Sequence, residues 1–225
     1  MNVRFTRNHG YVLLVLSVAA VTLTATGCLT TMANLINAGW GNLVPAQFDG
    51  LREKRVAVIC VSGSSAFGPS SASTTIARQV TRLLKKNVRD IEIIEQQHVE
   101  RWIDENDWNQ VDYLEIGRGV GADVLVAVDL RSFSLHDGQT MYRGRADVSV
   151  TVYDMAQGKD EEEVFHISPP QFQYPKNTGQ HTADIAEAEF RRNFISFVSL
   201  RIARYFYPYE VRDDYANDTL ILSSS

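Results

Sequence analysis

The loop after the first apolar run has the residue types of a phosphate-binding loop. Gly63 and Gly68 have the spacing of a Walker motif, but Pro69 stands where that motif has its lysine. The proline removes both a cation and a backbone N–H donor, so we do not expect an NTPase. A small-anion site at the start of the following helix stays open, with the hydroxyls of Ser70, Ser71 and Ser73 as its candidate ligands. Helix capping and turn formation explain the same serines more simply.

Nucleophilic and metal chemistry have weaker support in the sequence. Ser62 and Ser64 lie near this loop, while the histidines that could assist them are scattered, at His136, His166 and His181. The sequence has no Gly-x-Ser-x-Gly elbow, no His-Glu-x-x-His motif and no Cys/His cluster. We therefore expect no enzymatic activity, no metal and no cofactor. A periplasmic hydrolase or small-ligand-binding protein using residues 62–73 is the alternative function.

Cys28 is the residue whose chemistry the sequence specifies best. It follows a basic start, an apolar core at residues 11–23 and the run Ala25-Thr26-Gly27. A core of this length is typical of a cleaved signal peptide, whereas a transmembrane helix needs ~20 apolar residues. The run ending in Cys28 resembles the bacterial lipobox, in which the cysteine thiol is diacylated. An ordinary signal peptide with an incidental cysteine is the alternative interpretation.

Composition limits the partners and the compartment. The chain has a formal net charge of −5 at pH 7, which argues against nucleic acid as a partner. Leu29 after the cysteine points to the outer membrane, with the protein anchored by lipid and facing the periplasm; the inner membrane and the cell surface are the alternatives. The second cysteine, Cys60, lies in an apolar run and is interpreted as a small buried hydrophobic residue.

Hydrophobic patterns predict a single two-layer α/β (α+β) domain. Strands are expected at residues 55–61, 91–94, 122–135, 141–154 and 163–167. Helices are expected at residues 74–86, near 99–103, at 111–120, and from Thr182 to just before Pro208. This order predicts a mixed sheet of about five strands with a β-meander and with helices on one face.

The same patterns divide the chain into four parts. Residues 1–27 are the signal peptide, 28–54 the lipidated cysteine and a spacer, 55–209 the α/β domain and 210–225 a C-terminal tail. The aromatic run at residues 205–209 is a candidate binding surface, although packing of a helix on the sheet explains it more simply.

Alternation along the predicted hairpin places charged side chains on the face opposite the helices. Pairing Val126 with Val150 and Val128 with Val148 would put apolar partners on one face. The other face then carries three arginines within an acidic protein, namely Arg131, Arg143 and Arg145. A ladder of solvated ion pairs is the simpler interpretation. Our hypothesis is that these arginines dock an acidic partner protein or polymer.

Two segments carry a resemblance to known proteins, over about residues 55–207. They are Arg55-Val56-Ala57-Val58-Ile59 and Gly121-Ala122-Asp123-Val124-Leu125-Val126. The chain resembles envelope proteins with an anticodon-binding-like α/β domain, which include lipoprotein activators of penicillin-binding proteins, the curli secretion-channel lipoprotein and the N-terminal domain of the Tol β-propeller protein. Residues 44–51 with Phe206-Tyr207-Pro208 are also similar to uncharacterised bacterial lipoproteins.

The resemblance implies a fold and a location, and it supplies no catalytic residues. We expect a non-enzymatic, lipid-anchored protein that binds another cell-envelope component, during assembly or cell-wall maintenance. A structural lipoprotein without a specific ligand is a further alternative. The sequence does not specify an oligomeric state.

Replacing the candidate lipidation residue tests the anchor directly. In bacteria fed labelled palmitate, Cys28→Ser should abolish incorporation because serine has no thiol to acylate. Cys60→Ala serves as the control and should keep the label. Incorporation into the Cys28→Ser protein would contradict the lipid anchor.

Overall fold

The strand expected at residues 55–61 forms the centre of the sheet. It is β2 (Arg55–Ser62) in a computed structural model that describes residues 43–63, 71–106, 112–156 and 163–210. β2 pairs in parallel with β3 (Glu92–Ile93) on one side and with β4 (Val124–Asp137) on the other. Its β-branched residues suit a strand that is buried on both faces.

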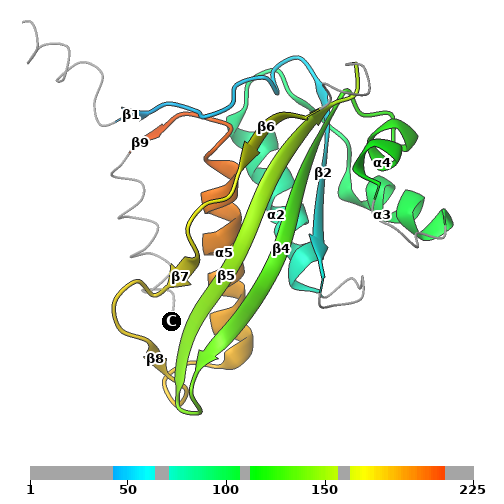
Figure 1. The fold of residues 1–225 in the computed structure, drawn as a ribbon. Helices are drawn as coiled ribbons and strands as arrows, with labels where there is room; N and C mark the ends of the chain where they lie inside the picture. The colour runs from blue at the N-terminus through cyan, green and yellow to red at the C-terminus, as the bar shows by residue number, and fades with distance from the viewer. Residues whose placement is uncertain (1–42, 64–70, 107–111, 157–162, 211–225) are drawn as a thin grey trace, which may run out of the picture. The chain divides into compact units, whose positions relative to one another are not determined.

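A long antiparallel hairpin continues the sheet beyond β2. β4 pairs with β5 (Met141–Asp154), and β5 then pairs with three shorter strands along its other edge (Figure 1). These are β6 (Glu163–Ile167), β7 (Phe172–Tyr174) and β8 (Gln180–His181). The main strand order is β3-β2-β4-β5-β6. Two short strands, β1 (Leu43–Val44) and β9 (Tyr209–Glu210), form a separate two-stranded sheet.

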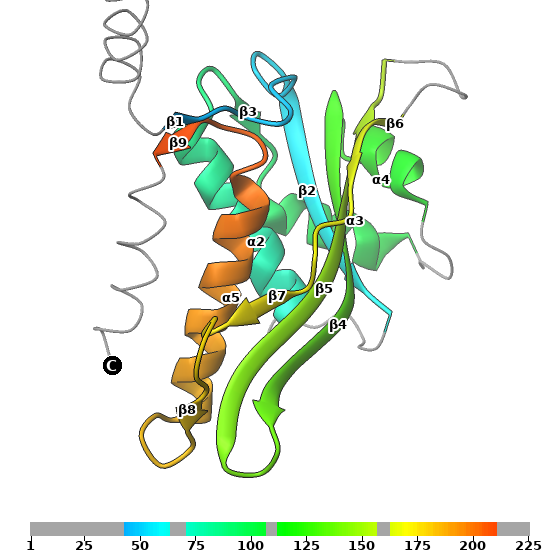
Figure 2. The ribbon, with the colours of Figure 1, turned by 60° about the vertical axis from the view of Figure 1, so that its left-hand side comes forward.

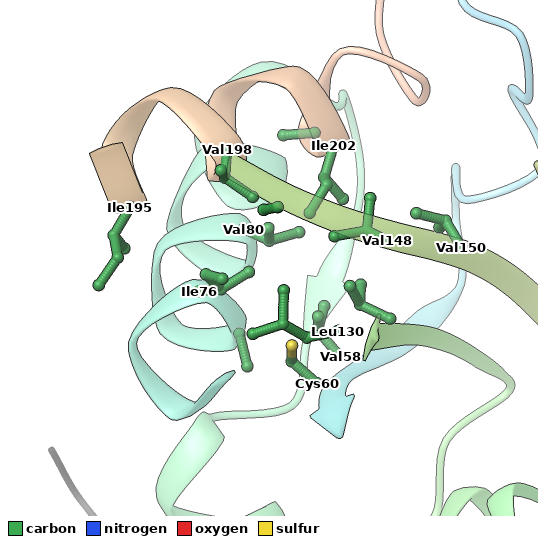
Figure 3. Close-up of a cluster of buried hydrophobic side chains, with 14 of the residues drawn as sticks. Val58, Cys60, Ile76, Val80, Leu130, Val148, Val150, Ile195, Val198 and Ile202 are labelled. Carbon is green, nitrogen blue, oxygen red and sulfur yellow. The ribbon is translucent and has the colours of Figure 1, made fainter. Parts of the chain in front are cut away.

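Two long helices cover one face of the sheet, α2 (Ala72–Asn87) and α5 (Glu187–Ala203) (Figure 2). Alternate side chains of β2, β4 and β5 face them and form the larger hydrophobic core. Figure 3 shows this core, with Val58, Cys60, Ile76, Val80, Leu130, Val148, Val150, Ile195, Val198 and Ile202 labelled. The mixed α/β fold with a meander is therefore confirmed.

A smaller pair of helices lies on the opposite face of the sheet. The patterns predicted both helices but placed all helices on one face, and that part of the prediction was wrong. They are α3 (Gln96–Glu105) and α4 (Tyr113–Gly119), and they pack on the side chains of β2 and β4 that point away from α2 and α5. This second core contains Ala57, Ile59, Leu125 and Ala127 of the strands. Helices thus cover one face broadly, and α3 and α4 cover part of the other.

Among the described residues, no helix combines the length and apolar character needed to cross a bilayer.

Two details of the predicted elements were wrong. The last helix begins at Glu187 instead of near Thr182, because the intervening residues pair with the hairpin: the Thr182 N–H donates to the carbonyl oxygen of Thr140 over 2.9 Å. Val126 lies opposite Val152, two residues beyond the predicted Val150. Apolar partners still share one face, because a shift by two residues preserves the alternation.

Close packing of α5 on the hairpin gives a stability prediction. A Cβ at Gly144 would lie 2.5 Å from Cγ of the fully buried Phe194, whereas a Cβ at Gly63 would meet nothing within 4 Å. Gly144→Ala should therefore lower the free energy of unfolding by about 1–3 kcal/mol through overpacking. Urea unfolding measures this change, with Gly63→Ala as the matched control. Equal midpoints for the two variants would contradict the packing described here.

Candidate functional site

Two of the three predicted arginines lie side by side on the outer face of the hairpin. In β5, Tyr142 stacks on Phe190 of α5, and Gly144 faces the same helix. Arg143 and Arg145 alternate with these residues and so point to the opposite side. In Figure 1 the hairpin lies in front of α5, so this face is turned toward the viewer.

The carboxylate of Asp137 forms an ion pair with each of these two arginines. Nη1 of Arg143 lies 3.0 Å from Oδ2 of Asp137, and Nη2 of Arg145 lies 3.1 Å from Oδ1. Arg143 also donates from Nη2 to the carbonyl oxygen of Asn177 over 3.3 Å. The hydrogen bond from Arg145 is the main cause that lowers the pKa of Asp137. Two guanidinium groups thus share one negative charge near the tip of the hairpin.

The third arginine lies apart from this pair. Arg131 falls where the β4–β5 register shifts, between Leu130 and Ser132, and it donates from Nη2 to the carbonyl oxygen of Val148 over 3.2 Å. Its charged neighbour is Asp147, whose pKa is lowered chiefly by a hydrogen bond from Ser132. We call Arg131, Arg143 and Arg145 together the arginine face.

Helix α4 marks one boundary of the arginine face. The hydroxyl of Tyr113 donates a hydrogen bond to Asp129, and its ring stacks on Tyr153 at a centroid distance of 5.6 Å. Burial, followed by this hydrogen bond, raises the pKa of Tyr113. Asp129 is therefore partly covered by a helix, whereas the arginines lie further along the hairpin toward its tip.

The serines proposed as anion ligands are engaged with one another where the structure describes them. Ser71 is the N-cap of α2, because its Oγ accepts a hydrogen bond from the Thr74 N–H over 3.1 Å. Ser73 is buried, and its Oγ lies 3.0 Å from that of Ser71. Ser70 lies outside the described residues, as does the lipidation candidate Cys28. The anion-binding role of the three serines and the lipidation of Cys28 stay predictions.

The interpretation of Cys60 is confirmed. Its side chain is buried in the main core, and this burial raises the pKa of its thiol (Figure 3). The neutral thiol packs as a small hydrophobic group, which makes a nucleophilic role unfavourable.

A serine–histidine contact that the sequence did not single out lies on β6. Nε2 of His166 is 3.2 Å from Oγ of Ser168, and Nδ1 is 2.9 Å from Oγ1 of Thr151. Glu163 is more distant, at 4.0 Å from Nδ1. In a catalytic triad a carboxylate orients the histidine. Here the hydroxyl of Thr151 lies closer to Nδ1 of His166 than the carboxylate of Glu163 does. Within the described residues, no group of three or more His, Cys, Asp or Glu could hold a metal ion.

A groove of about 500 Å³ lies beside β7 and is lined by residues from the end of α5 and from the chain after β1. The backbone N–H groups of Gln47 and Phe48 donate to the carbonyl oxygen of Tyr205 and so fix this segment to the helix end. We call this cavity the β7 groove. It is lined by Val44, Pro45, Gln47, Pro169, Pro170, Gln171, Phe172, Gln173, Lys176, Phe197, Arg201, Arg204, Tyr205 and Tyr209.

Aromatic rings position two cations of the β7 groove. The guanidinium of Arg201 lies 5.1 Å from the ring centroid of Phe197, and that of Arg204 lies 4.3 Å from the ring centroid of Tyr209. The aromatic run at residues 205–209 contributes to the core and to the groove. Phe206 and Tyr207 are buried in the core, and Tyr205 and Tyr209 line the groove. This run was the only sequence signal of the groove.

Comparison with known proteins adds matches among solved structures. No family model matches the sequence, and no curated protein matches it. Lipoprotein GNA1162 from Neisseria meningitidis has a TM-score of 0.40 at 12% identity, covering 66% of this chain and 96% of that chain. The PelC dodecamer from Paraburkholderia phytofirmans gives 0.38 at 12% identity, with 72% and 91% covered. The LpoB C-terminal domain from Salmonella enterica gives 0.36 at 12% identity, with 56% and 87% covered.

The shared carboxylate gives a titration prediction. Arg145→Gln should raise the pKa of Asp137, and Arg143→Gln should raise it less, because the hydrogen bond from Arg145 is the main cause of the lowered value. NMR titration of the Asp137 carboxyl carbon measures both changes. An unchanged pKa in Arg145→Gln would contradict the ion pair.

The same shift has a defined effect on stability. Since the folded-state pKa of Asp137 is lowered, its contribution is present above the unfolded pKa and is lost as pH falls through the folded value. The acidic limb of the stability–pH curve should therefore be flatter for Arg145→Gln than for the unmodified chain.

Proposed function

We propose that this chain is a lipid-anchored bacterial envelope protein that binds another envelope component, a protein or a polymer, through the arginine face. The observation that carries the proposal is the sharing of Asp137 by Arg143 and Arg145 on the outer face of the hairpin. Cys28 would carry the lipid, and the outer membrane, facing the periplasm, is the proposed location.

Local charge favours an acidic partner. Two guanidinium groups share one carboxylate, so this part of the face keeps a net positive charge although the chain as a whole is at −5. The side chains of Arg143 and Arg145 are 27% and 31% exposed, which leaves N–H donors within reach of a partner. Guanidinium groups bind carboxylates and phosphates in a planar, bidentate geometry.

A purely structural role makes a different prediction for the same residues. Exposed ion pairs typically contribute only about 0–1 kcal/mol to stability. If the arginines served stability alone, their removal would shift the unfolding midpoint slightly and leave every interaction of the protein unchanged. The two roles can therefore be separated by measuring interactions in the cell.

Site-specific photocrosslinking tests the proposed docking surface. A photoreactive residue at position 143 or 145 should capture a defined envelope component, and the same residue at positions 86 or 101, on exposed parts of α2 and α3, should not. The variant Arg131→Ala/Arg143→Ala/Arg145→Ala should lose that interaction, because it removes the positive charge of the face.

A matched variant controls for the loss of three positive charges. Arg82→Ala/Arg89→Ala/Arg101→Ala removes three exposed arginines elsewhere and should keep the captured partner. Circular dichroism confirms that both variants are folded. If the folded arginine-face variant keeps every partner of the unmodified chain, the proposal is wrong.

A further inference from the structure

A cavity of about 460 Å³ is lined by residues of α2 and of the start of α3, and we call it the α2–α3 pocket. Its lining consists of Arg78, Thr81, Arg82, Glu95, Gln96 and Gln97. None of these residues belongs to the arginine face or to the β7 groove. A ligand in this pocket therefore contacts a different part of the molecule.

Thr81 points from α2 toward the first turn of α3. Nη2 of Arg78 lies 2.7 Å from Oε2 of Glu100 in α3. Nζ of Lys85 lies 2.9 Å from Oε1 of Glu95, the residue before α3. Thr81 comes three residues after Arg78 and four before Lys85, so the three side chains lie on one face of α2. The two ion pairs show that this face is turned toward α3.

Two polar atoms of the pocket are buried without a hydrogen-bond partner. Thr81 is 5% exposed, and its Oγ1 forms no hydrogen bond with a described residue. The same holds for Oε1 of Gln96. Buried polar atoms are nearly always paired, because each loses its bonds to water on burial. A hydroxyl that can donate and an amide oxygen that accepts together indicate a ligand that does both.

The start of α3 lacks the groups that usually satisfy a helix N-terminus. Its N-cap residue, Glu95, makes no capping hydrogen bond through its side chain, and its first turn contains no acidic residue. By contrast, Ser71 caps α2 and Asp112 caps α4. The first N–H groups of a helix have no intrahelical acceptor and carry the positive end of the helix dipole. In α3 these groups belong to Gln96 and Gln97, which line the pocket, and they suit an oxyanion.

Arg82 supplies the positive charge of the pocket, because the other two ionic residues in the lining form ion pairs. Nε of Arg82 donates to the carbonyl oxygen of Arg78 over 3.3 Å, which leaves its two terminal nitrogens as donors to a ligand. Arg82 and Gln97 are exposed, so a ligand enters from solvent on their side. The Gln96 side chain forms no hydrogen bond with a described residue, so its rotation gives a ligand access to Thr81.

We propose that the α2–α3 pocket binds a phosphate group that carries a proton, either as free phosphate or as a phosphate monoester of a lipid headgroup. Its oxygens accept hydrogen bonds from the Thr81 hydroxyl, from the N–H groups at the start of α3 and from Arg82, and its P–OH donates to Oε1 of Gln96. At about pH 6, roughly half of the phosphate monoester groups carry this proton. Sulfate and phosphodiesters do not. This site goes beyond the docking of a partner on the arginine face and does not require it.

Thermal unfolding of the full chain, purified in mild detergent at about pH 6, tests the site. A ligand that binds only the folded chain raises the melting temperature as its concentration increases, and this dependence gives an apparent Kd. Sodium phosphate should raise the melting temperature saturably. Sodium sulfate at equal concentration and ionic strength should raise it less. Sulfate is the control because both salts also stabilise folded chains by exclusion from their surfaces.

Two threonine variants separate binding from folding. Thr81→Val should weaken phosphate binding about tenfold or more, and it should not lower the melting temperature in phosphate-free buffer, where the hydroxyl has no partner. Thr75→Val should do the opposite. Oγ1 of Thr75 donates to the carbonyl oxygen of Ser71 over 2.9 Å, so its loss should lower the melting temperature and change the affinity less than about twofold.

Arginine variants test the charge of the pocket. Arg82→Gln should weaken phosphate binding about tenfold, whereas Arg101→Gln, at an exposed position of α3 outside the pocket, should change it less than about twofold. The arginine-face variant should keep phosphate binding. Its control variant, which lacks Arg82, should lose phosphate binding and keep the captured partner. The two proposals therefore fail separately.

Phosphatidic acid, a monoester lipid, separates the two sources of phosphate when it is added to the detergent micelles, with the diester phosphatidylglycerol as its control. Stabilisation by phosphatidic acid without an effect of free phosphate assigns the pocket to a lipid headgroup, and stabilisation by free phosphate assigns it to soluble phosphate. Equal effects of phosphate and sulfate, with no effect of phosphatidic acid, would overturn the proposal. A Thr81→Val chain that is less stable without phosphate but binds phosphate as before would also overturn it, because the hydroxyl would then have a purely structural role.

Discussion

The parallel pairing of β2 with β4, buried on both faces, is the constraint on which the rest of the structure depends. One set of side chains, such as Val58 and Val126, faces α2 and α5, and the other set, such as Ala57 and Leu125, faces α3 and α4. The first charged residue in β4 is Asp129, which accepts a hydrogen bond from Tyr113 of α4. Beyond this point the strand alternates between apolar and polar residues, and the outer face of the hairpin becomes polar.

Strong patterns predicted the long elements, and weak patterns missed the short ones. The strands at residues 141–154 and 163–167 have the predicted bounds. Over the 14 residues of the first strand, alternation has one consistent interpretation. β7 and β8 have three and two residues, too few for a period to be visible. The β4–β5 register also depends on two irregularities, between Leu130 and Ser132 and between Ser134 and His136, which hydrophobicity does not reveal.

The same distinction applies to the candidate sites. Alternation predicted that Arg143 and Arg145 share a face, whereas Arg131 falls at a register shift and lies apart from them. The β7 groove was not predictable as a cavity, because its walls come from three distant parts of the chain: residues 44–47, residues 169–176 and the end of α5. Only tertiary packing brings these parts together, and the aromatic run was an ambiguous signal, since two of its five residues, Phe206 and Tyr207, enter the core.

The two basic surfaces differ in how their arginines are held. On the arginine face a carboxylate orients two guanidinium groups and cancels one charge. In the β7 groove, the guanidinium groups of Arg201 and Arg204 lie against the rings of Phe197 and Tyr209. Ordering a long side chain before binding saves about 0.5–1.5 kcal/mol for each one that would otherwise be immobilised. The negative charge elsewhere on the chain acts weakly at these contacts, because salt screens exposed charges beyond about 8 Å at physiological ionic strength.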